Sequence, residues 1–317
     1  MSNENFSPVI FLMGPTAAGK TALALALHAE FPVDIVSVDS SQVYRGMDVG
    51  TAKPTLADQA KAPHRLIDIR DPAEPYSAAE FRVDALQEIS KIIHAGRIPL
   101  LVGGTMFYFH ALEYGLAPLP SANQEIRERL NEESRQTGWA HLHERLQALD
   151  PDAAARIDPN DAQRIQRALE VVELTGRPSS DWHTKTPDAV IPYDVIKIGI
   201  YPRERQQLHD RIASRFDRML DQGLVAEVEH LRERGDLTPE LPSMRTVGYR
   251  QVWQYLTGLV NYNEMTQRGV VATRQLAKRQ LTWLRKYRGV YYLDSDSADL
   301  SAVCGDYLTG SFGHKGL

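Results

Sequence analysis

The chain has 317 residues, of which 43% are hydrophobic and 24% charged, an ordinary balance for a globular protein of roughly two domains. Its single cysteine, Cys304, excludes an internal disulfide and a cysteine-based zinc site, and it fits the reducing cytoplasm in which we expect the protein to work. No apolar stretch is long enough to span a bilayer, and the opening residues MSNENFSP lack a secretory pattern, so neither membrane insertion nor secretion is expected. Because the net charge is -5, any nucleic-acid site must be a local basic patch.

Strands and helices alternate in the first third of the chain. Short apolar or β-branched runs predict strands at residues 9–14, 34–39 and 98–104. Helices are expected at residues 21–31 and 77–95. The second begins with a capping box, Ser77 to Glu80, and Gly96 stands at the usual helix stop. This alternation predicts a parallel sheet with helices on both faces.

The alternation stops at about residue 117. From there to residue 191 no convincing strand is found, and prolines, Pro187 among them, divide short polar helices. A strand is expected again at residues 194–202, mostly helix at 204–288, and a last strand at 290–294. We therefore predict an α/β catalytic core with C-terminal helices, residues 1–116 and 194–317, interrupted by a helical insertion domain, residues 117–193.

The sequence GPTAAGKT has the G-x-x-x-x-G-K-T spacing of a phosphate-binding loop. A strand is expected before it and a helix after it, so its backbone amides can surround an anion at the positive end of the helix. Lys20 supplies a full positive charge, and the Thr21 hydroxyl is a ligand for Mg²⁺. The motif indicates phosphate binding but does not imply ATP hydrolysis. Its residues are Gly14, Pro15, Thr16, Ala17, Ala18, Gly19, Lys20 and Thr21.

Asp39 follows the second expected strand, and ligands of open parallel sheets bind at the carboxyl ends of strands. Three roles are open for its carboxylate: organising magnesium, acting as a general base, or capping a turn. The neighbouring Ser40, Ser41 and Gln42 add donors and acceptors that can read the edge of a base.

The third expected strand ends in Gly103, Gly104 and Thr105. A kinase or ATPase commonly places an acidic residue at the end of such a strand to organise magnesium. This strand ends without one, which argues against a motor or hydrolase function. We expect the two glycines to permit close approach of a ligand, with the aromatic Phe107 and Tyr108 nearby.

Two segments are rich in arginine. Residues 268–288 carry seven basic and no acidic residues, with Arg274, Lys278 and Arg285 on one helical face and aromatic residues between them. This pattern is typical of a helix that follows a phosphate backbone, although a solvated charged helix has the same composition. In residues 208–220, Arg211, Arg215 and Arg218 form a stripe beside an apolar face, and the residues alone favour a solvated surface there.

Eight segments, in one order along the chain, resemble those of bacterial tRNA dimethylallyltransferases. They are GPTAAGKT, DSSQVYRGMDVGTAKP, PHRLIDI, YSAAEF, LVGGTMFY, RIQRALEV, RTVGYRQVW and TRQLAKRQLTWLRK. The resemblance runs from Val9 to about Asp294. It implies a P-loop NTPase-like α/β core with an inserted helical domain, and transfer of a dimethylallyl group from dimethylallyl diphosphate to N6 of the adenosine at tRNA position 37, 3′ of the anticodon. It also implies Mg²⁺ as cofactor, the anticodon stem-loop as partner and a monomeric enzyme.

The resemblance also assigns roles to residues. The loop with Lys20, Thr21 and Arg215 holds the diphosphate, Asp39 is the base for the adenine amine, and Thr105 contacts the target nucleotide. Further tRNA contacts are assigned to Asp39, Ser40, Ser41, Gln42, Arg127, Gln163, Arg164, Ile165, Gln166, Arg167, Arg245, Thr246, Val247, Gly248, Tyr249, Arg250, Lys278, Arg279, Gln280, Leu281, Thr282, Trp283, Leu284 and Arg285.

Three alternative functions stay open at this point. The phosphate loop alone favours a nucleotide or small-molecule kinase, but a kinase has no use for the extended basic segment. A free-adenylate isopentenyltransferase has related chemistry, but the insertion and the basic segment argue against its small acceptor. A non-catalytic RNA-binding protein would leave Lys20 and Asp39 without a role.

Overall fold

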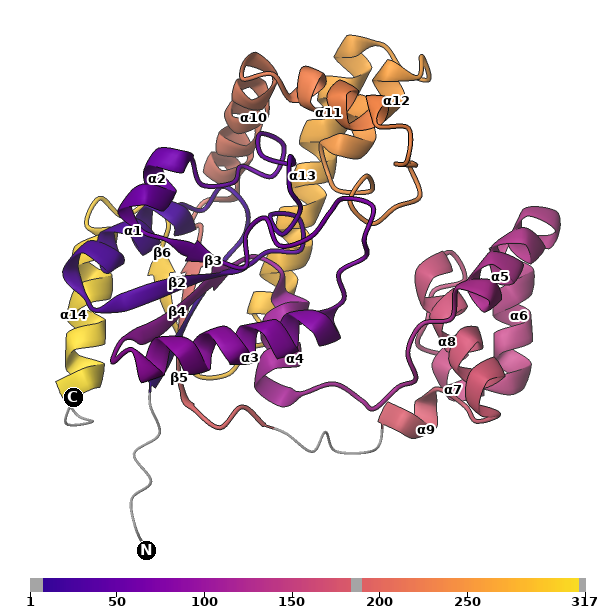
Figure 1. The fold of residues 1–317 in the computed structure, drawn as a ribbon, viewed down its shortest axis with the longest axis horizontal. Coiled ribbons are helices and arrows are strands. Elements are labelled where there is room, and N and C mark those ends of the chain that lie inside the picture. The colour runs from indigo at the N-terminus through magenta and orange to yellow at the C-terminus, as the bar shows by residue number, and fades with distance from the viewer. Residues whose placement is uncertain (1–7, 184–189, 314–317) are drawn as a thin grey trace, which may run out of the picture. The chain divides into compact units, whose positions relative to one another are not determined.

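The computed structural model describes residues 8–183 and 190–313. The chain forms two compact units, one of Met1–Glu113 with Pro192–Leu317 and one of Tyr114–Ile191 (Figure 1). The insertion predicted at 117–193 starts three residues later and ends two residues later than the second unit. The prediction that the chain lacks a secretory signal rests on its opening residues, and residues 1–7 lie outside the described ranges. Pro187, one of the prolines predicted to divide the short helices, also lies outside them.

The first unit is built on a six-stranded parallel sheet in the order β3-β2-β4-β1-β5-β6. The strands are β1 (Pro8–Met13), β2 (Val33–Val38), β3 (His64–Arg65), β4 (Ile98–Gly103), β5 (Asp194–Tyr201) and β6 (Val290–Asp294). The central strand β1 is buried along its whole length, and its Ile10 pairs with Leu100 of β4 and Ile196 of β5. The predicted parallel sheet is confirmed, and only the two-residue β3 was missed.

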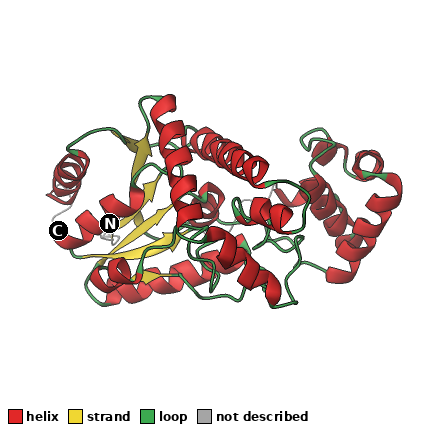
Figure 2. Cartoon of the chain, turned by 90° about the horizontal axis from the view of Figure 1, so that it is seen from above, coloured by secondary structure: helices red, strands yellow, loops and turns green. Residues whose placement is uncertain are grey.

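Helices cover both faces of this sheet (Figure 2). The helices of this unit are α1 (Lys20–Glu30), α2 (Leu56–Lys61), α3 (Ala78–His94), α4 (Met106–Tyr114), α10 (Arg205–Asp221), α11 (Leu224–Glu233), α12 (Tyr249–Leu256), α13 (Tyr262–Leu284) and α14 (Leu300–Gly313). Because side chains alternate along β1, Ile10 packs with α1 and α14, whereas the Phe11 ring meets Phe109 of α4 with 5.0 Å between centroids. The predicted capping box of α3 is present, with Ser77 and Glu80 bonding each other's backbone amides.

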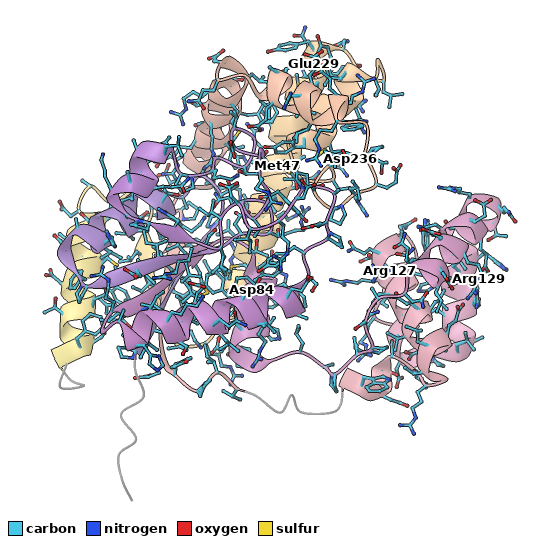
Figure 3. All side chains as sticks on the ribbon, in the orientation of Figure 1. Met47, Asp84, Arg127, Arg129, Glu229 and Asp236 are labelled. Atoms are coloured by element: carbon cyan, nitrogen blue, oxygen red, sulfur yellow. The ribbon has the colours of Figure 1, made fainter. Side chains whose placement is uncertain are left out.

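The second unit is helical. It contains α5 (Gln124–Thr137), α6 (Trp139–Leu149), α7 (Pro151–Ala154), α8 (Ala162–Thr175) and α9 (Ser180–His183), and its described residues hold no strand, as predicted. Leu130, Leu142 and Ile165 are fully buried in a separate small core. Figure 3 shows Arg127 and Arg129 on α5 of this unit.

None of the helices within the described ranges has the length and the apolar character needed to cross a lipid bilayer.

Candidate active site

The phosphate loop joins β1 to α1, as the motif predicts. Strand β1 ends at Met13 and α1 begins at Lys20, with Gly19 as its N-terminal cap in a left-handed conformation. Ala17 also has a positive φ of 62°, which side-chain-bearing residues seldom adopt. The loop is therefore held in a tight, strained curl at the positive end of α1, which is suited to binding an anion.

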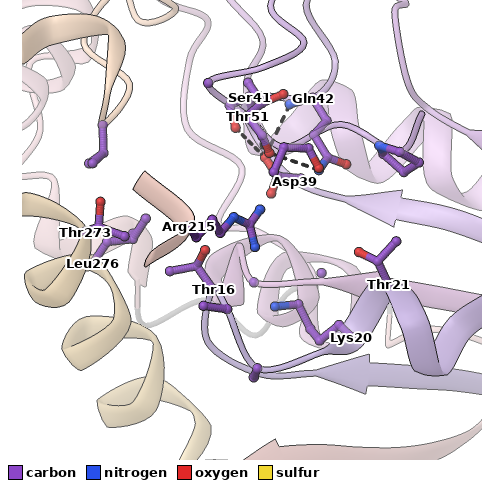
Figure 4. Close-up of a pocket in the computed structure, with 18 of the residues that line it drawn as sticks. Thr16, Lys20, Thr21, Asp39, Ser41, Gln42, Thr51, Arg215, Thr273 and Leu276 are labelled. Carbon is purple, nitrogen blue, oxygen red and sulfur yellow. Dashed lines mark hydrogen bonds between the residues drawn. The ribbon is translucent and has the colours of Figure 1, made fainter. Parts of the chain in front are cut away.

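A pocket of about 260 Å³ lies beside this loop and brings together the four predicted catalytic residues. Lys20 and Thr21 reach it from α1, Asp39 from the end of β2, and Arg215 from α10 (Figure 4). Two helices, α10 and α13, contribute Ile212, Phe216, Met219 and Leu276 to the apolar part of the wall. The pocket thus combines charged side chains at one end with an apolar wall.

The surroundings of Lys20 and Arg215 disfavour the charged forms of both side chains. Burial and, to a smaller extent, the charge of Arg215 lower the pKa of the Lys20 ammonium to about 7, although the nearby Asp39 acts in the opposite direction. Burial likewise lowers the pKa of the Arg215 guanidinium. Lys20 donates only to the Pro15 carbonyl, at 2.7 Å, among the described residues. An anion bound here would stabilise the charged forms of both side chains.

Asp39 uses its two carboxylate oxygens differently. Its Oδ1 accepts hydrogen bonds from the Ser41 amide at 2.9 Å, the Ser41 hydroxyl at 2.6 Å and the Gln42 amide at 3.3 Å. Its Oδ2 accepts no hydrogen bond from the described residues, and Figure 4 shows the carboxylate facing the Arg215 guanidinium. One oxygen therefore caps a turn while the other is free for chemistry, so the two roles do not compete. Among the described residues that line the pocket, Asp39 is the only carboxylate.

The residues after Asp39 make hydrogen bonds to other parts of the protein. The Gln42 amide group donates to the carbonyls of Thr51 and Ala52 at 3.3 and 3.4 Å, and its oxygen accepts from the Ser37 hydroxyl at 3.1 Å. The Ser40 amide donates to the Thr105 hydroxyl at 3.1 Å, which ties the ends of β2 and β4. The Gln42 side chain is thus committed to the pocket wall and is not free to read a base edge in this conformation.

The packing of the protein itself requires glycine at the two positions that end β4 and follow it. A β-carbon on Gly103 would overlap the Val38 carbonyl, and one on Gly104 would overlap the side-chain amide of Gln280. The close neighbours are parts of the protein, and both glycines also line the pocket, so the close approach of a ligand to them stays a prediction.

Helix α13 presents some of its basic residues outward. Lys278, Arg279 and Arg285 are exposed, whereas Arg274 is half-buried and its Nε has no partner in the described residues. Arg285 lies over the Tyr201 ring, 5.5 Å from its centroid. The predicted common face of Arg274, Lys278 and Arg285 is therefore only partly accessible.

An aromatic cluster adjoins this helix. Trp283 meets the rings of Phe107 and His110 edge-on, at 6.3 and 5.8 Å between centroids. Phe107 is 47% exposed, which is unusual for a phenylalanine and leaves a ring face open.

The sequence model of the IPP transferase family matches residues 42–287. This chain belongs to the IPP transferase family.

Three solved structures resemble this IPP transferase over most of its length. The tRNA isopentenylpyrophosphate transferase of Bacillus halodurans is 36% identical, has a TM-score of 0.72, and is matched over 98% of both chains. The tRNA delta(2)-isopentenylpyrophosphate transferase of Staphylococcus epidermidis is 33% identical, with a TM-score of 0.70 and coverage of 97% of this chain and 99% of its own. A eukaryotic dimethylallyltransferase acting on tRNA is 26% identical, with a TM-score of 0.78 over 96% of this chain and 80% of its own. The predicted family and the P-loop-like α/β fold are confirmed.

The segment 245–250 divides between the pocket and the core of the transferase. Thr246, Val247 and Gly248 line the pocket, and Arg245 and Arg250 are exposed. Tyr249 is fully buried, so its side chain is not available to tRNA.

Glu227 of α11 is a structural residue that the sequence did not reveal. Its carboxylate accepts hydrogen bonds from Tyr249 and from the backbone amides of Asp48, Val49 and Gly50, at 2.9, 2.7 and 3.1 Å. It thereby anchors the loop whose Gly50, Thr51 and Ala52 line the pocket.

In the helical unit, two of the predicted tRNA-contacting arginines form internal ion pairs. Arg127 and Arg167 bind the fully buried Glu170 at 2.9 and 2.6 Å. Burial alone would raise the pKa of Glu170, but hydrogen bonds from both arginines outweigh it and keep that pKa below its ordinary value. Ile165 is buried in the core and cannot reach tRNA. Gln163 and Arg164 are exposed on α8.

The pocket offers oxygen ligands that fit Mg²⁺. No group of three or more His, Cys, Asp or Glu side chains within residues 8–183 and 190–313 could hold a metal by itself. Mg²⁺, however, commonly takes only one or two protein oxygens and completes its shell with water and substrate phosphates. The Thr21 hydroxyl and the Asp39 carboxylate both line the pocket beside the phosphate loop, so the donor set suits this ion.

Proposed function

We propose that this transferase moves a dimethylallyl group from dimethylallyl diphosphate to N6 of the adenosine at position 37 of tRNA, releasing diphosphate. One observation carries the proposal: two half-buried cations, Lys20 and Arg215, share a pocket with a single carboxylate, Asp39, and an apolar wall. The cations suit the diphosphate, the wall suits the five-carbon chain, and the carboxylate suits the amine.

The donor half of the reaction follows from the cations. The C1–O bond of the donor breaks, and its electron pair passes to the diphosphate oxygen. Lys20, Arg215 and the loop amides stabilise the negative charge that develops there, and they do so in a buried site where such stabilisation is strong. Mg²⁺, held by the Thr21 hydroxyl with the Asp39 carboxylate nearby, would add further positive charge at the leaving group.

The acceptor half follows from Asp39. The adenine N6 nitrogen forms the new bond to C1 and must lose one proton, for which Oδ2 is the available acceptor. The three hydrogen bonds to Oδ1 keep the carboxylate in one orientation while the proton moves. The products are N6-dimethylallyladenosine in tRNA and free diphosphate.

The surface near α13 supports an RNA acceptor. Exposed Lys278, Arg279 and Arg285 can contact phosphates, and the open ring of Phe107 beside Trp283 can stack on an unpaired base of the anticodon loop. A nucleotide kinase would need neither feature.

Incubation with labelled dimethylallyl diphosphate and tRNA, followed by mass analysis of the nucleosides, tests the proposal. We expect label on adenosine of tRNA, in a product heavier by one dimethylallyl group. Label on free AMP but not on tRNA would favour a free-adenylate isopentenyltransferase, and transfer of phosphate from ATP would favour a kinase.

A further inference from the structure

Gln280 lies on the inward side of α13 and bridges two parts of the donor pocket. Its Oε1 accepts a hydrogen bond from the Thr16 amide of the phosphate loop at 2.8 Å, and its Nε2 donates to the Gly104 carbonyl at 2.9 Å. Gly104 directly follows β4, and all three residues line the pocket. One side chain therefore joins the loop after β1 to the end of β4.

A side-chain amide suits this bridge. It needs one donor and one acceptor at its tip, which glutamine has, whereas glutamate has acceptors alone and leucine has neither. The fit is also tight, because any side chain on Gly104 would overlap Nε2 of Gln280.

The phosphate loop needs such support from outside. Ala17, the residue after Thr16, has a φ of 62°, a conformation that costs a side-chain-bearing residue free energy and persists only where neighbours enforce it. Gln280 holds the amide immediately before this strained residue. Without the bridge, we expect the loop to relax and its amides to turn away from the anion.

We propose that Gln280 is a positioning residue that fixes the phosphate loop in the conformation that binds the donor diphosphate. The proposal rests on the function proposed above, and it reassigns a residue that the family resemblance places among the tRNA contacts. The same helix then carries two separate groups: exposed cations that face solvent, and one inward amide that shapes the donor site.

The test compares Gln280→Leu, Gln280→Glu and Gln275→Leu. Gln275 is the matched control, since it is a glutamine on the same helix but exposed. Binding of inorganic diphosphate is measured by calorimetry, binding of unmodified tRNA by filter retention, and KM for each substrate by steady-state kinetics.

We expect Gln280→Leu to weaken diphosphate binding about tenfold or more, because it removes two hydrogen bonds, each typically worth about 1 kcal/mol, and 1.4 kcal/mol is tenfold in affinity. KM for the donor should rise while KM and affinity for tRNA stay within about twofold. Gln280→Glu should weaken diphosphate binding at least as much, because it turns a carboxylate oxygen toward the Gly104 carbonyl and adds a negative charge beside the loop. Gln275→Leu should match wild type.

Unchanged diphosphate binding in Gln280→Leu, or a drop in tRNA affinity as large as the drop in diphosphate affinity, would overturn the proposal. If Gln280→Leu does not fold, Gln280→Met, which is neutral, as long as glutamine and without an amide, decides by the same two affinities. Inorganic diphosphate is the probe because it tests the loop without any transfer reaction. If the wild-type enzyme binds diphosphate but leaves tRNA unmodified, the proposed function is contradicted. The effect of the Gln280 variants on diphosphate binding can still be measured in that case.

Discussion

Arg215 of α10 and Lys20 of α1 enter one pocket, and the positive charge of Arg215 adds to burial in lowering the pKa of Lys20 to about 7. The free enzyme therefore carries a mostly charged Lys20 below pH 7 and a mostly neutral one above it. A bound diphosphate favours the charged form and raises this pKa. Affinity for the donor should then be greatest below pH 7 and fall above it, by up to tenfold per pH unit until the pKa of the complex is reached.

Calorimetry at pH 8, in buffers of different ionisation enthalpy, measures this linkage. We expect uptake of up to one proton for each dimethylallyl diphosphate bound, since the donor's own phosphates, with a second pKa of about 6, are already ionised at that pH. Lys20→Met should abolish the uptake. Proton uptake that persists in Lys20→Met would assign the titration to another group.

Asp39→Asn should separate the two oxygens of Asp39. The amide oxygen can still accept from Ser41 and Gln42, so the turn and the donor affinity should be kept. The base is lost, and the single-turnover rate should fall about 10²- to 10⁴-fold. Asp39→Ala, the companion variant, should also lower the melting temperature because it removes the cap. A wild-type rate in Asp39→Asn would contradict the role as base.

Arg215→Ala should weaken donor binding, with Arg211→Ala as its control. Arg211 is one turn away on α10 but pairs with Asp296 at 2.8 Å instead of lining the pocket. Removing the Arg215 charge should also raise the pKa of Lys20, so proton uptake on donor binding at pH 8 should shrink. Equal effects of the two variants on donor affinity would return Arg215 to a general structural role.

The sequence predicted the parts of this structure that depend on neighbours along the chain. Strands β1, β2, β4, β5 and β6 are short apolar runs with clear ends, and the phosphate loop is a contiguous motif. The two-residue β3 is too short to show any periodicity. Helix α14 was missed because its sequence, LSAVCGDYLTGSFG, mixes apolar residues with glycine and threonine, which are poor helix formers.

The parts that could not be predicted depend on residues far apart in the sequence. Gln280 and Thr16 are 264 positions apart, and Glu227 is 179 positions from Asp48. No local pattern marks a glutamine that faces inward from a basic helix, so its helical stretch suggested only tRNA. Arg215 was recognised from the family resemblance, because its own stripe of arginines looked like solvated surface.

Charge reversal on α13 should weaken tRNA binding. The choice is Lys278→Glu with Arg285→Glu, because both side chains are exposed, whereas Arg274 is half-buried and its reversal would disturb packing. For each interaction with a tRNA phosphate that the reversal removes, the slope of log affinity against log salt should become shallower by about 0.7 to 0.9. Binding of dimethylallyl diphosphate, which depends on the pocket, serves as the folding control. If the tRNA affinity and its salt dependence stayed unchanged, the tRNA-binding surface would lie elsewhere, for example at the exposed Gln163 and Arg164.

Gly269→Ala should show how closely α13 supports the apolar wall of the donor site. Alanine inside an exposed helix is normally more stable than glycine by about 0.5 to 1 kcal/mol. At this position, however, a β-carbon would overlap the Phe216 ring, which lines the pocket with Ile212. The ring would have to turn or move, so we expect a lower melting temperature and a higher KM for the donor, with tRNA affinity unchanged.

The double variant Gly269→Ala with Phe216→Leu tests the same packing from the other side. A smaller side chain at position 216 makes room for the new methyl group, so the alanine should cost less stability in this background than in the wild type. If Gly269→Ala instead raised the melting temperature and kept the donor KM, the Phe216 ring of α10 would be able to move away from α13, although only 3% of the residue is exposed.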